Sequence, residues 1–374
     1  MSLVGLLYDE LSAPPTYSTD REDALLDFAA TPYRAEKVLS LGTLLALDAF
    51  LQMLVIMPVR AALAVFRAHW RSPDSIQLVV IMLAYRVLQH VNTSSIYRHL
   101  RGQAGITMFV LYSLTEVCDK FLCSVGHEMI SCLTSHRTMH SRRRLLAFSL
   151  VNFLYLVTHS FVLMWQLVTL NLAVNSFSNA LLSFILNNLF SEIKAAVFKK
   201  FNKDSLFQLT CADITQRFQY YSLLSVIVLR NLLNHWVSVG GPWFTASSLA
   251  TICGPAMLVA AVIVVVDWLK IAYIVNFNNL NSAELFRGYW ADLCQDFRAN
   301  RQHQHRSLVS KQAGLPVAPL VIVCVRMFAR GGVIWTPVTV LFFVLMLIMK
   351  MCLAAWTQRL TARKRKRRRI PNKN

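Results

Sequence analysis

The chain has 374 residues, of which 55% are hydrophobic and 15% carry a charge. Soluble domains usually carry about 25% charged residues, so this composition excludes an ordinary soluble enzyme or binding domain and indicates a membrane protein. The formal net charge is +19, from 38 Lys and Arg against 19 Asp and Glu. In a membrane protein such an excess is typical of basic loops on the cytosolic side, and we predict no nucleic-acid partner.

The amino-terminal third begins with a polar segment, and three largely apolar segments follow it. Residues 1–37 are polar, and we interpret them as a mobile arm. Residues 44–66 form the first predicted span and residues 76–96 the second, because each is close to the roughly 20 mostly apolar residues that cross a bilayer. Residues 106–129 are amphipathic, and their sequence fits both a crossing helix and a helix that lies in the interface.

Basic residues predict the orientation of the middle of the chain. Residues 136–144 contain four arginines and no acidic residue, so the connection 131–144 is placed in the cytosol. Residues 145–174 contain no Lys, Arg, Asp or Glu and cross away from the cytosol. Residues 181–198 return, which places the basic loop 199–219 back in the cytosol.

The last third follows the same alternation. An uncharged connection at 237–246 is predicted to be lumenal, whereas the loop at 276–314 and the tail at 357–374 are predicted to be cytosolic. The remaining predicted spans are 220–236, 247–275, 315–328 and 333–356. The sequence therefore predicts an all-α polytopic bundle of about seven to nine membrane helices within residues 38–356, some of them short, broken or interfacial.

Charged residues also fall inside or at the ends of predicted spans, among them Asp48, Arg86, Glu116, Asp119, Lys120, Arg230, Asp267, Lys270 and Arg326. A charge at the bilayer centre costs about 2.5–3.5 kcal/mol on insertion scales, so each of them must pair, reach the interface or face water. We predict pairing between helices. Asp267 and Lys270 lie three residues apart on one helical face, whereas Asp48 needs a partner from another helix. The alternative is a hydrophilic path for ions, lipid headgroups or a small solute.

Candidate chemistry is sparse in this sequence. His127 and Glu128 begin a metalloprotease-like pattern, but Ser131 stands where the second histidine ligand is required. Cys123 with His127, and His136 with His140, remain candidate ligand pairs at a spacing of four residues. The chain has no P-loop, Gly-rich dinucleotide motif or nucleophile elbow. We therefore predict a protein that is not an enzyme, with no catalytic residue, metal site or cofactor.

The carboxyl-terminal tail carries an uninterrupted basic run after the last predicted span. Each basic residue near an anionic leaflet contributes about 1 kcal/mol of membrane attraction. We predict that this run fixes the carboxyl terminus in the cytosol and contacts anionic lipid headgroups. Its members are Arg363, Lys364, Arg365, Lys366, Arg367, Arg368 and Arg369.

Four segments carry a family resemblance: 47–67, 96–130, 169–218 and 314–327. Within the third lies "NNLFSEIKAAVFKKF" (187–201), in which Glu192 and Lys199 lie opposite an apolar helical face and Lys200 lies close to it. The chain resembles the transmembrane anterior posterior transformation protein family over roughly residues 38–330. The matching polar positions are Arg101, Gly102, Gln103, Asn175, Glu192, Lys194, Lys199 and Lys200.

This resemblance implies a membrane protein of the endoplasmic reticulum or early secretory pathway, and a role at the base of the cilium in ciliated cells. It also implies a protein partner, in fungal relatives one with a SUN-like domain, and it implies no catalytic residue. Our leading hypothesis is a scaffold that supports folding quality control or trafficking, with residues 187–203 and 276–313 as contact surfaces. A transporter, channel or lipid scramblase that uses the intramembrane charges is the alternative.

Overall fold

The computed structural model describes residues 19–67, 73–103, 105–133, 135–175, 183, 187, 190–196, 199–239, 245–302, 315–329, 343–357 and 359. Every regular element in these ranges is a helix, and none of the described residues belongs to a strand. The prediction of an all-α fold is confirmed.

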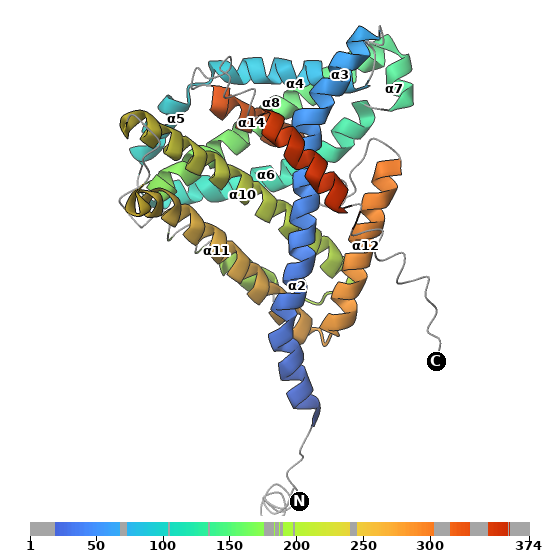
Figure 1. Ribbon diagram of the computed structural model, residues 1–374, viewed down its shortest axis with the longest axis vertical. Coiled ribbons are helices and arrows are strands. Elements are labelled where there is room, and N and C mark those ends of the chain that lie inside the picture. Colours follow the sequence, from blue (N-terminus) through green and yellow to red (C-terminus); the bar gives the residue numbers. More distant parts are fainter. Residues whose placement is uncertain are drawn as a thin grey trace, which may run out of the picture.

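The longest element is a rod of three consecutive helices that follows the long axis of Figure 1. It comprises α2 (Thr19–Leu51), the π-helix η1 (Gln52–Ile56) and α3 (Met57–Phe66). Proline lacks a backbone N–H and its ring clashes with the preceding turn, so Pro58 just after η1 disfavours a regular α-helix at this point. The wider π turn accommodates that defect without ending the rod.

Within the described part of the chain, three helices are long and apolar enough to cross a membrane: Leu25–Ala64, Arg142–Asn175 and Ala246–Phe277. The predicted spans 145–174 and 247–275 lie within the second and third of them, and the first contains 44–66 except for its last two residues. The second and third of these helices are α8 (Arg142–Asn175) and α11 (Ala246–Phe277). With a rise of about 1.5 Å per residue, each exceeds the roughly 30 Å hydrocarbon core, so their ends reach beyond it.

Shorter apolar helices cover Val317–Phe328, within α14 (Val317–Ala329), and Phe343–Thr357. The predicted spans 315–328 and 333–356 therefore contain helices, although residues 330–342 lie outside the described ranges. Half of the predicted span 181–198 lies outside them as well. The number of seven to nine membrane helices and their orientation stay predictions.

The predicted span 76–96 is wrong as a single helix. The structure has α4 (Pro73–His90) and α5 (Thr93–Arg101), separated at Asn92. The Asn92 side-chain oxygen accepts a hydrogen bond from the Ser94 amide at 3.1 Å, which caps α5 and starts a new helix. The neighbouring elements are α6 (Gly105–Leu133), which covers the amphipathic 106–129, and the short α7 (His136–His140).

Three segments interpreted as arm or loops are largely helical. Residues 19–37 of the predicted mobile arm belong to α2, most of 199–219 belongs to α10 (Lys203–Val239), and most of 276–314 belongs to α12 (Ser282–Gln302). Residues 1–18 lie outside the described ranges. The connection 131–144 holds α7 and the first residues of α8.

The segment 276–314 is largely helical because α12 packs against α2, as Figure 1 shows. Leu285, Phe286 and Leu293 of α12 are buried in one cluster with Val38 and Leu39 of α2. These positions recur at helical spacing in α12, whose other face is polar, so the helix is amphipathic. From its polar composition alone, this segment was predicted to be a loop, although it forms a packed helix.

A tyrosine ties α12 to the start of α10. The Tyr289 hydroxyl donates a hydrogen bond to the Lys203 carbonyl oxygen at 2.6 Å. Burial raises the pKa of Tyr289, so its hydroxyl keeps the proton that this bond requires. The contact fixes the point at which α10 begins beside α12.

Close packing of α2 on α10 depends on Gly42. A Cβ atom at this position would lie 2.2 Å from Cδ1 of the buried Ile214. We expect Gly42→Ala to lower the free energy of unfolding by about 1–3 kcal/mol, the usual cost of overpacking. The measurement is denaturant unfolding of the purified protein in mixed micelles.

Gly288 provides the matched control. It is exposed on α12, and apart from its chain neighbours and its own helix backbone no heavy atom would come within 4 Å of a Cβ atom there. Since alanine favours a helix by about 0.5–1 kcal/mol over glycine, Gly288→Ala should leave stability unchanged or raise it. Equal losses for both variants would refute the close α2–α10 contact.

Candidate functional site: a buried ionic network

Arg217 of α10 lies at one end of a network of buried charges between helices. Its Nε atom donates to Asp267 Oδ2 of α11 at 3.0 Å. Its Nη1 atom donates to both carboxylate oxygens of Glu36 of α2, at 2.9 and 3.0 Å. Trp268 Nε1 also donates to Glu36, at 2.8 Å. The guanidinium therefore joins three helices through two carboxylates.

Lys270 continues the network one turn further along α11. Its ammonium lies 2.5 Å from Asp213 Oδ1 of α10 and 3.8 Å from Asp267 Oδ1. The predicted local pairing of Asp267 with Lys270 is confirmed, although Asp213 is the nearer partner. Both the Lys270 and Asp213 side chains are only 3% exposed.

The motif residue Glu192 connects this cluster to α6. Its two carboxylate oxygens lie 3.3 Å from Lys120 Nζ and 3.8 Å from Lys270 Nζ. Gln216 donates a further hydrogen bond to Glu192 at 2.9 Å, and Lys120 also pairs with Glu116 at 3.1 Å. On a helical wheel Glu192 lies opposite the apolar face, yet its carboxylate lies between the buried Lys270 and the partly exposed Lys120.

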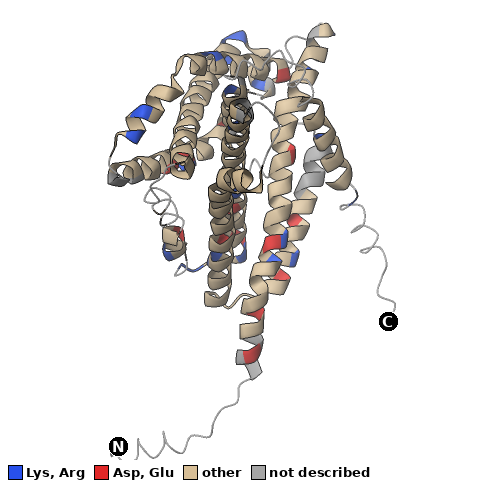
Figure 2. Cartoon of the chain, turned by 60° about the vertical axis from the view of Figure 1, so that its left-hand side comes forward, with Lys and Arg blue, Asp and Glu red and all other residues tan. Residues whose placement is uncertain are grey.

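This set of charges, which we call the ionic network, comprises Glu36, Glu116, Lys120, Glu192, Asp213, Arg217, Asp267 and Lys270. Figure 2 shows acidic and basic segments near one another along the lower half of the long helices. Five carboxylates face three bases in the network. When all are ionised, the acids are therefore in excess by two groups, and each base is shared between at least two acids.

Two further charges pair between helices. Asp48 of α2 lies 2.7 Å from Lys350, in the helix Phe343–Thr357, which confirms that its partner comes from another helix. Arg60 of α3 pairs with Asp74 of α4 at 3.0 Å. Arg86, by contrast, has an exposed side chain.

Arg326 of α14 is buried and acts as a cap. Its guanidinium donates to the carbonyl oxygens of Leu88 and Val91 at the end of α4, and it lies 3.2 Å from Met164 Sδ. A cation is favourable at a helix carboxyl terminus because the last carbonyls lack helical partners.

Asn175 and Arg230 meet at a cavity of about 280 Å³ between α5, α8 and α10. Asn231 Nδ2 donates to Asn175 Oδ1 at 2.8 Å, and Asn175 Nδ2 donates to Asn171 Oδ1 at 2.8 Å. The cavity thus has a wall of amides with one arginine. The sequence placed both residues among candidates without indicating that they adjoin.

The remaining motif residues lie on the surface or near it. Arg101 and Gly102 are exposed at the end of α5, where the Gly102 amide donates to Arg98 at 3.3 Å, and Gln103 is half-buried. Lys194, Lys199 and Lys200 are exposed. The basic run 363–369 lies outside the described residues.

Comparison with known proteins agrees with this architecture. The model of the "Eukaryotic membrane protein family" matches residues 68–366. The chain belongs to this family. Members include endoplasmic reticulum membrane protein 65 of Schizosaccharomyces pombe, 31% identical over 82% of this chain and 53% of the relative. The Gallus gallus homolog of transmembrane anterior posterior transformation protein 1 is 30% identical over 87% of this chain and 59% of the relative. The predicted family resemblance is confirmed.

The chain spans about half to three-fifths of the length of these two members. The Saccharomyces cerevisiae endoplasmic reticulum membrane protein 65 is 29% identical over 82% of this chain and 60% of the relative. The names of the two fungal members support a location in the endoplasmic reticulum membrane. No solved structure matches the chain.

Three members of the network were not predicted from the sequence: Glu36, Asp213 and Arg217. Each lay in a segment interpreted as a polar arm or loop. A usable signal was present, because Asp213 and Arg217 are four residues apart and share a helical face beside an apolar helix. Their partners lie 50 residues or more away in sequence, so no local pattern could identify them.

Proposed function

We propose that this protein is a non-enzymatic scaffold of the endoplasmic reticulum membrane. It recruits partner proteins that support folding quality control or trafficking and, in ciliated cells, organisation of the cilium base. The observation that carries the proposal is the closure of the ionic network: its charges pair with one another across helices. Such pairing favours a fixed framework over a hydrated path.

The partner surface in this proposal centres on Lys194, Lys199 and Lys200. These exposed lysines follow Glu192, whose carboxylate is held by the network, so the fold fixes the position of the basic surface. An acidic segment of a membrane partner, including one with a SUN-like domain, complements it. The tail at 363–369 would contact anionic headgroups and hold the carboxyl terminus at the cytosolic leaflet.

Proximity labelling from the carboxyl terminus tests the scaffold. We expect endoplasmic reticulum membrane proteins to be labelled in the wild type, and selected partners to be lost when Lys194, Lys199 and Lys200 are all changed to Glu. The matched control changes the same three residues to Arg, which keeps the charge and should keep the partners. Labelling of plasma-membrane proteins alone would contradict the proposal.

A flux and lipid-scrambling assay in proteoliposomes tests whether the protein transports solutes or lipids instead. A scaffold should show no activity above protein-free vesicles. Activity that Arg230→Ala abolishes would overturn the scaffold in favour of a transport protein, since Arg230 lines the amide-walled cavity.

A further inference from the structure

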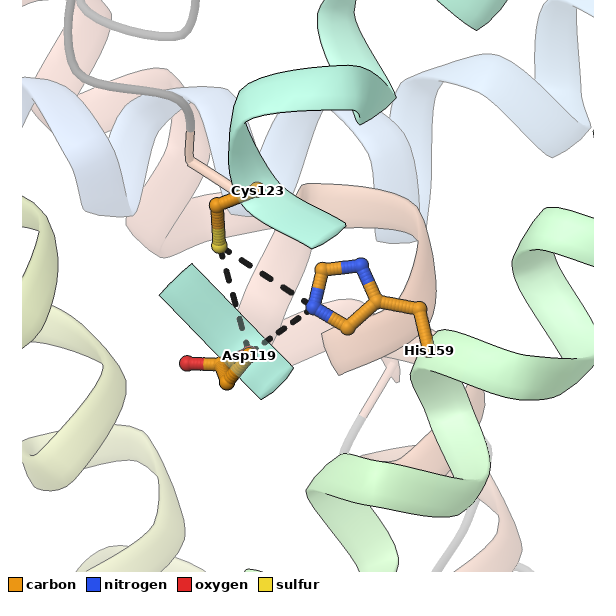
Figure 3. A group of neighbouring side chains, drawn as sticks. All are labelled: Asp119, Cys123 and His159. Carbon is orange, nitrogen blue, oxygen red and sulfur yellow. Dashed lines mark hydrogen bonds and ion pairs between the residues drawn. The ribbon is translucent and has the colours of Figure 1, made fainter. Parts of the chain in front are cut away.

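A separate polar cluster joins the middle of α6 to the middle of α8. Asp119 and Cys123 lie one turn apart on α6, and His159 reaches them from α8 (Figure 3). His159 Nε2 lies 2.8 Å from Asp119 Oδ1 and 4.0 Å from Cys123 Sγ. Cys123 Sγ lies 3.9 Å from Asp119 Oδ1. One atom of each side chain thus faces a common point.

The orientation of the imidazole distinguishes a metal site from a nucleophilic triad. In a triad the acid and the nucleophile bind opposite ring nitrogens of the histidine. Here Nε2 faces both Asp119 and Cys123, while Nδ1 lies 2.8 Å from the Tyr155 hydroxyl. Cys123 is therefore not placed for activation by a histidine that Asp119 orients. A ring nitrogen that shares a point with a carboxylate and a thiol is instead placed as a metal ligand.

Further side chains hold the three ligands in place. Tyr155 bonds the outer nitrogen of His159, and Gln219 Nε2 donates to the outer oxygen Oδ2 of Asp119 at 2.8 Å. Metal-binding histidines and carboxylates typically have such outer partners, which fix the ring and the carboxylate. Gly126 makes room for Tyr155, because a Cβ atom there would lie 1.9 Å from the Tyr155 hydroxyl.

The charges and distances also fit a divalent ion. His159 is fully buried and Asp119 is 6% exposed, so an ionised carboxylate here needs a counter-charge. A carboxylate, a thiolate and a neutral imidazole balance two positive charges. Ligand bonds of about 2.0–2.3 Å in a tetrahedral zinc site place ligand atoms roughly 3.3–3.6 Å apart. Shifts of about half an ångström from the distances in this structure would therefore suffice.

We propose that Asp119 Oδ1, Cys123 Sγ and His159 Nε2 bind a divalent transition metal, with Zn²⁺ as the ion that suits this ligand set. The three ligands leave a fourth position for water or another exchangeable ligand. A bound metal would link α6 to α8, because α6 supplies two of the ligands and α8 supplies the third. Its ligands are separate from the ionic network, and the inference does not depend on the scaffold function.

The test uses the full chain, purified in detergent with a histidine-free affinity tag and stripped with a chelator. Titrated Zn²⁺ should bind at one ion per chain, and Co²⁺ in its place should give a thiolate-to-cobalt absorption band. Cys123→Ser should abolish that band, whereas Cys118→Ser should retain it. Cys118 is a matched control because it lies on the same helix with a similarly half-buried side chain.

Two further variants separate metal binding from a structural role. Tyr155→Phe keeps the ring but removes the hydroxyl, and it should weaken Zn²⁺ binding by about 10–100-fold, as loss of an outer partner does. Zn²⁺ should also slow alkylation of Cys123 in the wild type, which requires no variant to fold. Absence of stoichiometric Zn²⁺ binding in the wild type, or a cobalt band that survives in Cys123→Ser, would overturn the site.

Discussion

Replacing Arg217 with alanine should lower the free energy of unfolding by about 3–5 kcal/mol, the cost of breaking a buried ion pair by removing one partner. The Arg217 side chain is 2% exposed and pairs with Glu36 and Asp267. Its loss leaves two carboxylates without their guanidinium in a region that already holds more acids than bases. Unfolding of the purified protein by denaturant in mixed micelles measures the effect. Arg217→Lys should retain part of the stability, since it keeps the charge but not the planar fork.

An exposed ion pair serves as the control for this prediction. Lys203 lies 3.8 Å from Glu284, and their side chains are 64% and 75% exposed. Surface pairs contribute at most about 1 kcal/mol, so Lys203→Ala should have a small effect. If Arg217→Ala is no more destabilising than Lys203→Ala, the network does not hold α2, α10 and α11 together.

Hydropathy predicted those helices that contain a long, nearly uncharged stretch of residues. Residues 145–174 carry no charge, so their apolar character identified α8 without any knowledge of its neighbours. The same reasoning identified α11 and the middle of the α2–α3 rod. Hydropathy did not predict α12 and the first half of α2, because these helices carry many polar residues and bury their apolar residues only against each other and their neighbours. A polar composition did not distinguish them from loops.

The site shows the same division between local and distant information. Asp267 and Lys270 were paired from sequence because they lie three residues apart on one face. Asp213, the nearer partner of Lys270, lies 57 residues away in sequence. His159 sits in an otherwise uncharged stretch and was not considered as a ligand. Only the packing of α6 on α8 brings it to Asp119 and Cys123.

Changing Lys270 to methionine should also destabilise the protein by about 3–5 kcal/mol. The side chain keeps most of its volume and loses the ammonium, which leaves Asp213 without its partner at 2.5 Å. Because the network holds more acids than bases, removing a base should destabilise the protein more than removing an acid. Glu116→Gln removes one acid from an acid-rich set, and Lys120 keeps Glu192 as a partner, so this change should be close to neutral or stabilising.

A double-mutant cycle isolates the pair itself. Asp213→Asn removes the charge that Lys270→Met leaves unpaired, so the double variant should be more stable than Lys270→Met alone, with a coupling energy of about 0.5–3 kcal/mol. Unfolding in mixed micelles gives all four free energies under one condition. Additive losses would mean that Lys270 acts mainly on Asp267 or Glu192, each of which lies 3.8 Å from its ammonium. A loss for Glu116→Gln as large as that for Lys270→Met would show that Lys120 needs the charge of Glu116, and it would contradict the idea that removing an acid from this network is tolerated.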